Sequence, residues 1–241
     1  MNVLAFDTSY AACSAAARAQ SQGGPVRIAH RYREMETGHA EALVPMIGEV
    51  IAEAGIEFCD LQRIVVAYGP GTFTGVRTAV AAARALALAT GAEIVAVSSL
   101  WAIAAAMTNA AAADNAATDG VMVVMDARKG QLYVQVIDAQ GRPQTEPILT
   151  EPEIAAALLP QQRLMVVGNA ADQVLAAADS QNRTNLRRRP AGLTCTDTAP
   201  NAIHLLDAAL HSSIAGPLLP LYLRPPDAKP QADKSLPWSS P

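Results

Sequence analysis

The stretch Tyr68-Gly69-Pro70-Gly71-Thr72-Phe73-Thr74-Gly75-Val76-Arg77 decides how this chain is organised. An apolar run, 64–67, precedes it, and an alanine-rich segment, 78–90, follows it. Three glycines and a proline within seven residues are typical of a sharp backbone turn. The order predicts a strand, a glycine loop and a helix. Such a loop can bind an anion at the helix N-terminus, or it can be a tight turn at which two backbones meet.

Two nucleotide-binding motifs can be tested directly against this loop. A P-loop would continue from its last glycine with Lys and Ser or Thr, but Val76 and Arg77 follow Gly75. The dinucleotide fingerprint is also missed, because the third glycine comes one residue late. Neither motif is met, so a structural turn and an anion site both stay open.

A second candidate for ligand contact is Asp7-Thr8-Ser9, which follows the first apolar run. Its oxygens could hold a metal-bound water or a phosphate. The alternative is an Asx or Ser/Thr turn that closes a hairpin. The candidate nucleotide-binding residues are Asp7, Thr8, Ser9, Gly71 and Thr72.

Composition limits the class of protein. The chain has 241 residues, of which 51% are hydrophobic and 4% aromatic, so it is globular with an alanine-rich interior. Its net charge of −4 argues against unaided nucleic-acid binding. Cys13, Cys59 and Cys195 are too scattered for a disulfide framework or a zinc site. The first residues lack a signal peptide and no segment reads as membrane-spanning, so we expect a cytoplasmic protein.

The first half of the chain predicts a strand meander that enters strand–helix units. The helix from His39 ends at Gly55, and Pro45 inside it leaves open a kink or a later start. A mixed sheet with helices on its faces follows from this order. The expected strands are 3–6, 13–17, 26–33, 64–67 and 94–97, and the expected helices are 39–55, 75–90 and 98–108.

The second half begins in the same way as the first. An apolar strand ends in Asp126 as the first strand ends in Asp7, and a hairpin follows each, which predicts a diverged internal duplication. The basic triplet 187–189 is expected to be a solvated loop. The expected strands are 121–125, 132–137, 144–149 and 164–167, and the expected helices begin at 150–153 and cover 169–178 and 200–210.

These patterns predict an α/β protein with two related subdomains, each a mixed sheet flanked by helices. The first subdomain covers 1–112 and is joined by the helix near 200–211. A linker at 110–120 leads to a smaller second subdomain, 118–198. The proline-rich end, 225–241, is expected to be mobile.

No catalytic or metal-binding residue is predicted. A zinc or iron site at His39 would need a second histidine one helical turn later, but position 43 is Leu43. The remaining histidines show no ligand spacing with it. The cysteines form no paired motif and no Gly-x-Ser-x-Gly elbow occurs, so covalent catalysis has no support.

The helix after the glycine loop carries small side chains on nearly every face, as helices buried on more than one side do. The preceding helix could simply cover it within one subunit. We predict instead that the two helices form an exposed apolar face that pairs with another subunit, and that Arg at Ala82 or Ala85 would break the pairing. The expected interface residues are His39, Leu43, Ile47, Gly75, Val76, Ala79, Ala82, Ala83 and Leu86.

The chain resembles the TsaB family, the glycoprotease-like paralogues of TsaD. The resemblance runs in order from the N-terminus to about Arg224, and the glycine loop is its most specific part. It is carried by Asp7-Thr8-Ser9, His39-Ala40-Glu41, the stretch 69–77, Asp126-Ala127-Arg128-Lys129-Gly130-Gln131-Leu132-Tyr133 and Tyr222-Leu223-Arg224. One position differs from the family pattern: this chain has Tyr68 where relatives often carry a small or basic residue.

The resemblance implies an actin-like, ribonuclease-H-like (ASKHA) fold. It further implies a role in making N6-threonylcarbamoyladenosine at position 37 of tRNA, as a non-catalytic subunit that binds and activates the transferase TsaD. A dimer through the two helices beside the loop is implied, as a heterodimer with TsaD or a homodimer when alone. TsaE, an ATPase, is an implied partner, and tRNA would be met only through the complex.

The resemblance implies no cofactor of the chain's own, no membrane contact, and ATP or ADP at most at the complex interface. The competing hypothesis is a nucleotide-hydrolysing or protease-like enzyme with its own active site. An enzyme of this kind would need either a Walker lysine or a pair of metal-binding histidines. The sequence patterns contain neither, and this absence favours the non-catalytic subunit over the enzyme.

Overall fold

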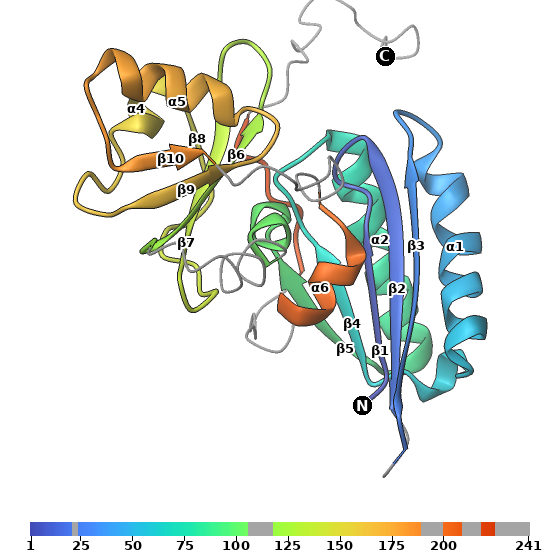
Figure 1. Cartoon of the computed structure of the whole chain (residues 1–241). Helices are drawn as coiled ribbons and strands as arrows, with labels where there is room; N and C mark the ends of the chain where they lie inside the picture. The colour runs from blue at the N-terminus through green and yellow to red at the C-terminus, as the bar shows by residue number, and fades with distance from the viewer. Residues whose placement is uncertain (21–23, 106–117, 189–199, 209–217, 225–241) are drawn as a thin grey trace, which may run out of the picture.

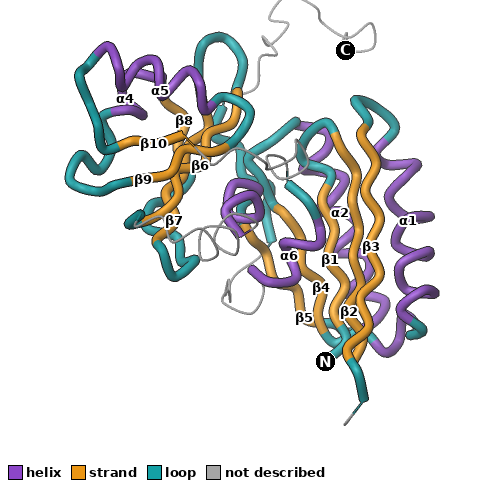
Figure 2. Tube along the Cα trace, viewed as in Figure 1, coloured by secondary structure: helices purple, strands orange, loops and turns teal. Residues whose placement is uncertain are grey.

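The computed structural model describes residues 1–20, 24–105, 118–188, 200–208 and 218–224. Within them the chain forms two five-stranded sheets, each with helices on its faces (Figures 1 and 2). The expected linker, Cys195, His211 and the proline-rich end lie wholly or mostly outside these residues.

The first sheet has the strand order β3-β2-β1-β4-β5. β1, β2 and β3 form an antiparallel meander, whereas β4 and β5 run parallel to β1. The predicted mixed sheet is confirmed, and each strand is slightly longer than expected. The bounds are β1 Val3–Asp7, β2 Ala12–Gln20, β3 Val26–Glu34, β4 Arg63–Ala67 and β5 Glu93–Val97.

Helices α1 (His39–Ala54) and α2 (Phe73–Thr90) cover one face of this sheet. α1 begins at His39 despite Pro45, so the alternative of a later start is wrong, and Gly55 ends it in the left-handed conformation. α2 begins two residues before the expected Gly75, because Thr72 caps it. Between α1 and β4 lies a short 3₁₀ turn, η1 (Phe58–Asp60), that the sequence patterns did not predict.

The second sheet repeats the order of the first, as β8-β7-β6-β9-β10 against β3-β2-β1-β4-β5. The pairing directions also match, with an antiparallel meander followed by parallel strands. This repeat is the structural counterpart of the predicted duplication. The bounds are β6 Gly120–Asp126, β7 Leu132–Asp138, β8 Ile148–Thr150, β9 Leu164–Val167 and β10 Leu186–Arg188.

Three expectations for the second half need correction. β8 is shorter than predicted and begins at Ile148, and the helix expected at 169–178 is α5, Ala171–Ser180. Two residues of the basic triplet, Arg187 and Arg188, do not lie in a loop, because Leu186–Arg188 pairs with β9 as an edge strand and Arg188 forms an ion pair with Asp172. Arg189 lies outside the described residues. α4 (Pro152–Ala156) begins with proline, as predicted.

The core has three layers that follow from the alternation of side chains along the strands. Leu4 and Phe6 of β1 face α1 and α2, whereas Val3 and Ala5 face the opposite side. That opposite side is filled by the helical residues 99–105, by α6 (Ala202–Ala208) and by β6 of the second sheet. α4 and α5 close the outer face of the second sheet.

The two sheets are therefore joined through a shared hydrophobic cluster. Polar contacts reinforce the junction: the Ser98 hydroxyl donates to Gln135 Oε1, and Trp101 Nε1 donates to the carbonyl of Gly141 at 2.9 Å. None of the helices in the described ranges combines the length and the apolar character that crossing a membrane requires.

Candidate functional site: the glycine loop and its neighbours

The end of β1 and the glycine loop, which the sequence singled out separately, lie against each other. Thr72 N–H donates to the carbonyl of Ser9 at 2.7 Å, and the Thr8 hydroxyl donates to the carbonyl of Gly75 at 2.7 Å. These bonds join residues more than sixty positions apart in the chain. The strand end and the first turn of α2 therefore form one unit.

Two glycines make this close approach geometrically feasible. A Cβ atom on Gly71 would lie 2.3 Å from the carbonyl oxygen of Ser9. A Cβ atom on Gly75 would lie 1.9 Å from the carbonyl oxygen of Thr8 and 2.6 Å from Thr72 Oγ1. All three separations are far below van der Waals contact, so only glycine fits at either position. The sequence left open whether the loop binds an anion or brings two backbones together, and the structure shows the close approach.

The polar groups of Asp7, Thr8 and Ser9 are bonded within the chain. All three residues are buried. Ser9 donates its N–H to Asp7 Oδ1 at 3.0 Å and its hydroxyl to Asp7 Oδ2 at 2.8 Å. This is the Asx turn that was the alternative to a phosphate site. Nucleotide contact at Asp7, Thr8, Ser9, Gly71 and Thr72 stays a prediction, and the described contacts of these residues lie within the chain.

Asp7 is nevertheless electrostatically unusual. Burial raises the pKa of its carboxyl to about 6, although the two hydrogen bonds from Ser9 favour the charged form. The Tyr10 hydroxyl is also buried, which raises its pKa well above the ordinary value, and it has no hydrogen-bond partner among the described residues. The equivalent strand-end residue of the second sheet, Asp126, is exposed and accepts a bond from Arg128 N–H at 2.8 Å.

His39 has a structural role at the start of α1. Its ring Nε2 lies 2.9 Å from the carbonyl of Tyr10, which ties α1 to the loop after β1. Among the described residues, no group of three or more His, Cys, Asp or Glu side chains is placed to hold a metal ion. Cys13 is buried beside Met46, and burial raises the pKa of its thiol to about 11. A thiol with so high a pKa is a poor nucleophile.

The predicted interface residues lie mostly beneath the surface. Seven of the nine are buried, because they pack against the first sheet. Ala82 and Leu86 are partly buried in the same cluster. The expectation that all nine form an exposed face is therefore wrong for the buried seven, although partner binding by the two helices stays a prediction. The buried residues are His39, Leu43, Ile47, Gly75, Val76, Ala79 and Ala83.

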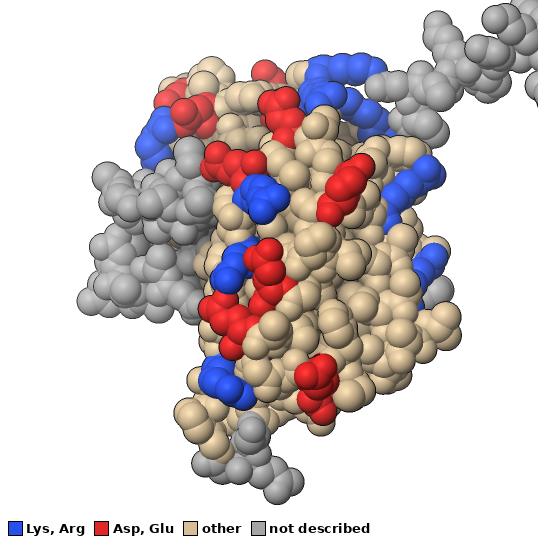
Figure 3. All heavy atoms as spheres, turned by 90° about the vertical axis from the view of Figure 1, so that its right-hand side faces the viewer, with Lys and Arg blue, Asp and Glu red and all other residues tan. Residues whose placement is uncertain are grey.

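Other side chains on the same helices point outward. Leu88 of α2 is 90% exposed and Val44 of α1 is 65% exposed. Ala81 and Ala85 of α2 are exposed as well. Figure 3, which views the molecule from the side where α1 lies in Figure 1, shows a broad area without charged side chains beside a column of acidic and basic groups. Sequence periodicity could not find these residues, since alanine occupies both the inner and the outer face of α2.

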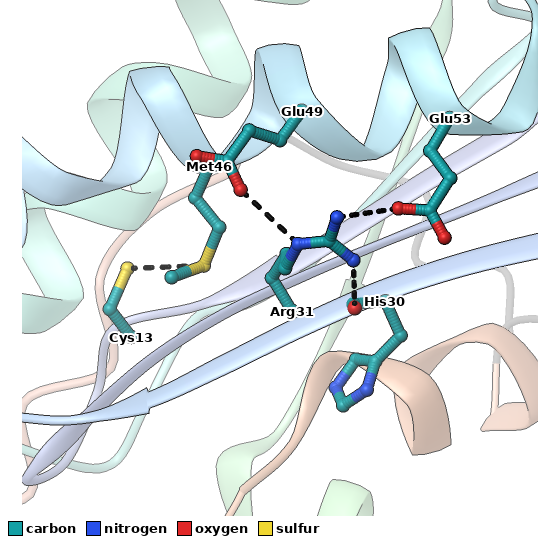
Figure 4. Close-up of polar contacts among 6 residues, drawn as sticks. All are labelled: Cys13, His30, Arg31, Met46, Glu49 and Glu53. Carbon is teal, nitrogen blue, oxygen red and sulfur yellow. Dashed lines mark hydrogen bonds and ion pairs between the residues drawn. The ribbon is translucent and has the colours of Figure 1, made fainter.

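The groove between β3 and α1 is charged. It has a volume of about 150 Å³, and Arg31, Glu41 and Glu49 are among its lining residues. Arg31 bonds to Glu49 at 3.2 Å and to Glu53 at 2.6 Å, and Figure 4 shows its guanidinium between the two carboxylates. Exposed pairs of this kind contribute little stability. The charged groups that line this groove therefore satisfy one another across β3 and α1.

One structural element near the loop was missed by sequence reasoning. Residues 218–224, which we call the strap, lack regular secondary structure but are tied to α2 and the loop. Leu221 N–H donates to the carbonyl of Tyr68 at 2.8 Å, and Arg77 Nε donates to the Tyr222 hydroxyl at 2.7 Å. Arg84 donates to the carbonyl of Leu218. The strap thus lies beside the glycine loop, and its sequence signal was the end segment Tyr222-Leu223-Arg224, which carries part of the family resemblance.

Comparisons with known proteins agree with this architecture. The family model described as TsaD, tRNA N6-adenosine threonylcarbamoyltransferase, matches residues 33–144. An uncharacterized protein of Mycobacterium tuberculosis is 32% identical over 232 residues, which cover 95% of each chain. The tRNA threonylcarbamoyladenosine biosynthesis protein TsaB of Haemophilus influenzae is 29% identical over 242 residues, covering 93% of this chain and 94% of that protein.

A solved structure is similar along nearly the whole chain. YeaZ from Pseudomonas aeruginosa superposes with a TM-score of 0.68 at 28% identity, covering 92% of this chain and 99% of that one. The two sheets of equal strand order, each flanked by helices, give the α/β fold of the actin-like ASKHA class. The expected fold class is confirmed. From the relatives, the solved neighbour and the match to the TsaD family model, this chain belongs to the TsaB family.

Proposed function

We propose that the chain is a subunit without an active site of its own that binds and activates TsaD in the biosynthesis of threonylcarbamoyladenosine in tRNA. The relatives named TsaB support the pathway, and the match to the TsaD family model supports a paralogous relation to the transferase. A cytoplasmic location is part of the proposal, because tRNA is modified there. TsaE is proposed as a further partner, and the chain pairs with itself when TsaD is absent.

One observation carries the proposal: α2 exposes apolar side chains, with Arg77 and Arg84 between them, while hydrogen bonds fix the neighbouring glycine loop to the end of β1. Ala81, Ala85 and Leu88 face outward, and α1 places Val44 on the same side of the sheet. On its inner face, the small side chains of Ala79 and Ala83 allow α2 to pack close to the sheet. A firmly held helix that presents apolar side chains loses little entropy when a partner covers it.

The enzyme alternative receives no comparable support. A covalent mechanism needs a nucleophile with an adjacent base. The Cys13 thiol is buried with a raised pKa, and the oxygens of Asp7 are engaged by Ser9. Nucleotide contact at Asp7, Thr8, Ser9, Gly71 and Thr72 stays a prediction, and ATP or ADP at the junction with TsaD stays the expectation that the family resemblance carries.

Reconstitution of the modification reaction tests the proposal. TsaD, TsaE, the threonylcarbamoyl-adenylate synthase and unmodified tRNA would be combined with and without this chain, and modified nucleoside would be quantified by mass spectrometry. The proposal expects the rate to rise at least tenfold on addition of the chain. Equal rates in both reactions would overturn the activating role.

Incubating the chain alone with unmodified tRNA and threonylcarbamoyl-adenylate separates the two hypotheses. Modified nucleoside in that reaction would show that the chain itself transfers the group. Its absence there, together with stimulation in the full mixture, is the pattern that the accessory role expects.

A further inference from the structure

The exposed side of α2 carries two arginines among its apolar side chains. Arg77, Ala81, Arg84 and Leu88 follow one another at steps of three and four residues, so they form one row along the helix, which we call the α2 stripe. All four side chains are exposed, and the sequence of α2 contains no acidic residue. A partner that covers the α2 stripe must therefore accommodate two positive charges as well as apolar groups.

Ring contacts and hydrogen bonds hold both guanidinium groups in place. Arg77 lies 3.7 Å from the centroid of the Phe73 ring and donates from Nε to the Tyr222 hydroxyl at 2.7 Å. Arg84 donates from a terminal nitrogen to the carbonyl of Leu218 in the strap. A guanidinium has five N–H donors, and among the described residues these bonds use one nitrogen of each arginine. Both groups thus offer a partner further donors at fixed positions.

The carboxylates of the neighbouring helix α1 are directed away from the α2 stripe. Glu49 and Glu53 both pair with Arg31 of β3, at 3.2 and 2.6 Å, as Figure 4 shows. Glu41 lines the groove between α1 and β3. Of the ion pairs formed by the described residues, none involves an arginine of the α2 stripe. The helices that flank the face therefore leave both of its positive charges without a carboxylate.

A second copy of the chain is a poor match for this face. In a two-fold dimer the same patch serves on both subunits, so each copy would bring its own two arginines into the contact. The glutamates of α1 lie on the β3 side, so the helices of neither copy would supply a carboxylate. Covering charges that stay unpaired is costly, and bringing like charges together adds to the cost. The two arginines therefore weaken pairing of the chain with itself.

We propose that Arg77 and Arg84 decide which partner covers the α2 stripe, by opposing a second copy of the chain and favouring a partner surface that presents carboxylates. The inference rests on the proposed function, which makes TsaD that partner. Arginine can pair with a carboxylate through two parallel hydrogen bonds, which gives strength and geometric selectivity. Guanidinium groups that are already held in place lose little entropy when such pairs form. Specific interfaces commonly combine attraction to one partner with repulsion of another.

The variant Arg84→Gln tests the proposal, because glutamine keeps a hydrogen-bond donor for the Leu218 carbonyl but carries no charge. Self-association of the full chain would be measured by sedimentation equilibrium, and association with TsaD by calorimetry. We expect self-association to tighten roughly tenfold and association with TsaD to weaken roughly tenfold or more. Arg84→Lys, which keeps the charge, should self-associate as weakly as the wild type. The matched control is Arg163→Gln, an exposed arginine just before β9, which should leave both associations unchanged.

The opposite signs of the two expected changes make the test selective, since loss of the fold would weaken both associations. The double variant Arg77→Gln/Arg84→Gln should self-associate still more tightly and bind TsaD still more weakly. High salt should narrow the preference of the wild type for TsaD, because ions screen both the repulsion and the attraction. An Arg84→Gln variant that weakens both associations, or changes neither, overturns the proposal. So does a double variant that stays monomeric at every protein concentration.

This inference and the proposed function can fail independently. If the wild type binds TsaD and stimulates modification, but Arg84→Gln changes both associations in the same direction, only the role of the arginines is wrong. If the wild type neither binds TsaD nor stimulates modification, the proposed function fails. Self-association of the variants then decides by itself whether the arginines oppose a second copy.

Discussion

The carbonyl oxygen of Thr8 lies 1.9 Å from the point that a Cβ atom on Gly75 would occupy, and the Thr8 hydroxyl bonds back to the Gly75 carbonyl. The end of β1 and the first turn of α2 thus meet backbone to backbone. These contacts position α2, the helix that exposes Ala81, Ala85 and Leu88.

Gly75→Ala should therefore destabilise the protein. The new methyl group would push the helix start away from β1, and overpacking of this kind costs roughly 1–3 kcal/mol. Urea unfolding followed by circular dichroism measures the change. Gly48 of α1 is the matched control, because a Cβ there meets no atom within 4 Å. Gly48→Ala should raise the free energy of unfolding by about 0.5–1 kcal/mol, and equal effects of the two substitutions would contradict the close approach.

The cap of α2 makes a separate contribution. Thr72 Oγ1 accepts a bond from Gly75 N–H at 3.2 Å. Thr72→Ala should lower the free energy of unfolding by about 1 kcal/mol, because a helical N–H loses its partner, whereas Thr72→Ser keeps the oxygen and should recover most of the loss. The urea denaturation midpoints of the wild type, Thr72→Ala and Thr72→Ser measure these differences in stability. A serine variant as unstable as the alanine variant would show that the methyl group of Thr72, not its oxygen, matters.

Local patterns predicted most of the fold because the elements that carry it are long and regular. The repeat of apolar residues in α1 and the strand–loop–helix order around the glycine stretch depend on neighbours in sequence. β10 was missed because three residues, two of them arginines, carry no strand pattern of their own. Its structure comes from backbone pairing with β9.

The site was harder to predict because its contacts are remote in sequence. Thr8 and Gly75 are 67 positions apart, and Arg77 and Tyr222 are 145 apart. The alanines of α2 explain why Ala79 and Ala83, which were expected on an exposed face, are buried. Since they occupy every side of the helix, periodicity cannot tell which side faces the sheet, and only packing places Ala79 and Ala83 inward and Ala85 outward.

Burial of Asp7 makes stability depend on pH. Its pKa is about 6 in the folded chain, above the 3.8 of an ordinary aspartate, so the folded state binds the proton more tightly than the unfolded state. This stabilisation is complete below about pH 4 and is lost as the pH rises through 6. Between pH 5 and pH 7 the wild type should lose about 1.4 kcal/mol relative to Asp7→Asn, whose amide does not titrate. Urea unfolding at several pH values measures this difference, and parallel curves for the two proteins would refute the raised pKa.

The outer face of α2 can be tested without disturbing the core, because Leu88 is 90% exposed. Leu88→Asp should leave the thermal unfolding temperature nearly unchanged, since few contacts are lost, but burying a carboxylate against a partner is costly. We therefore expect association with TsaD, measured by calorimetry, to weaken at least tenfold and the stimulation of tRNA modification to fall with it.

Ile154 is the matched control, an apolar residue 55% exposed on α4 beside the second sheet. Ile154→Asp should bind TsaD as the wild type does. Equal loss in both variants would indicate a general effect of surface charge, and normal binding by Leu88→Asp would place the partner elsewhere.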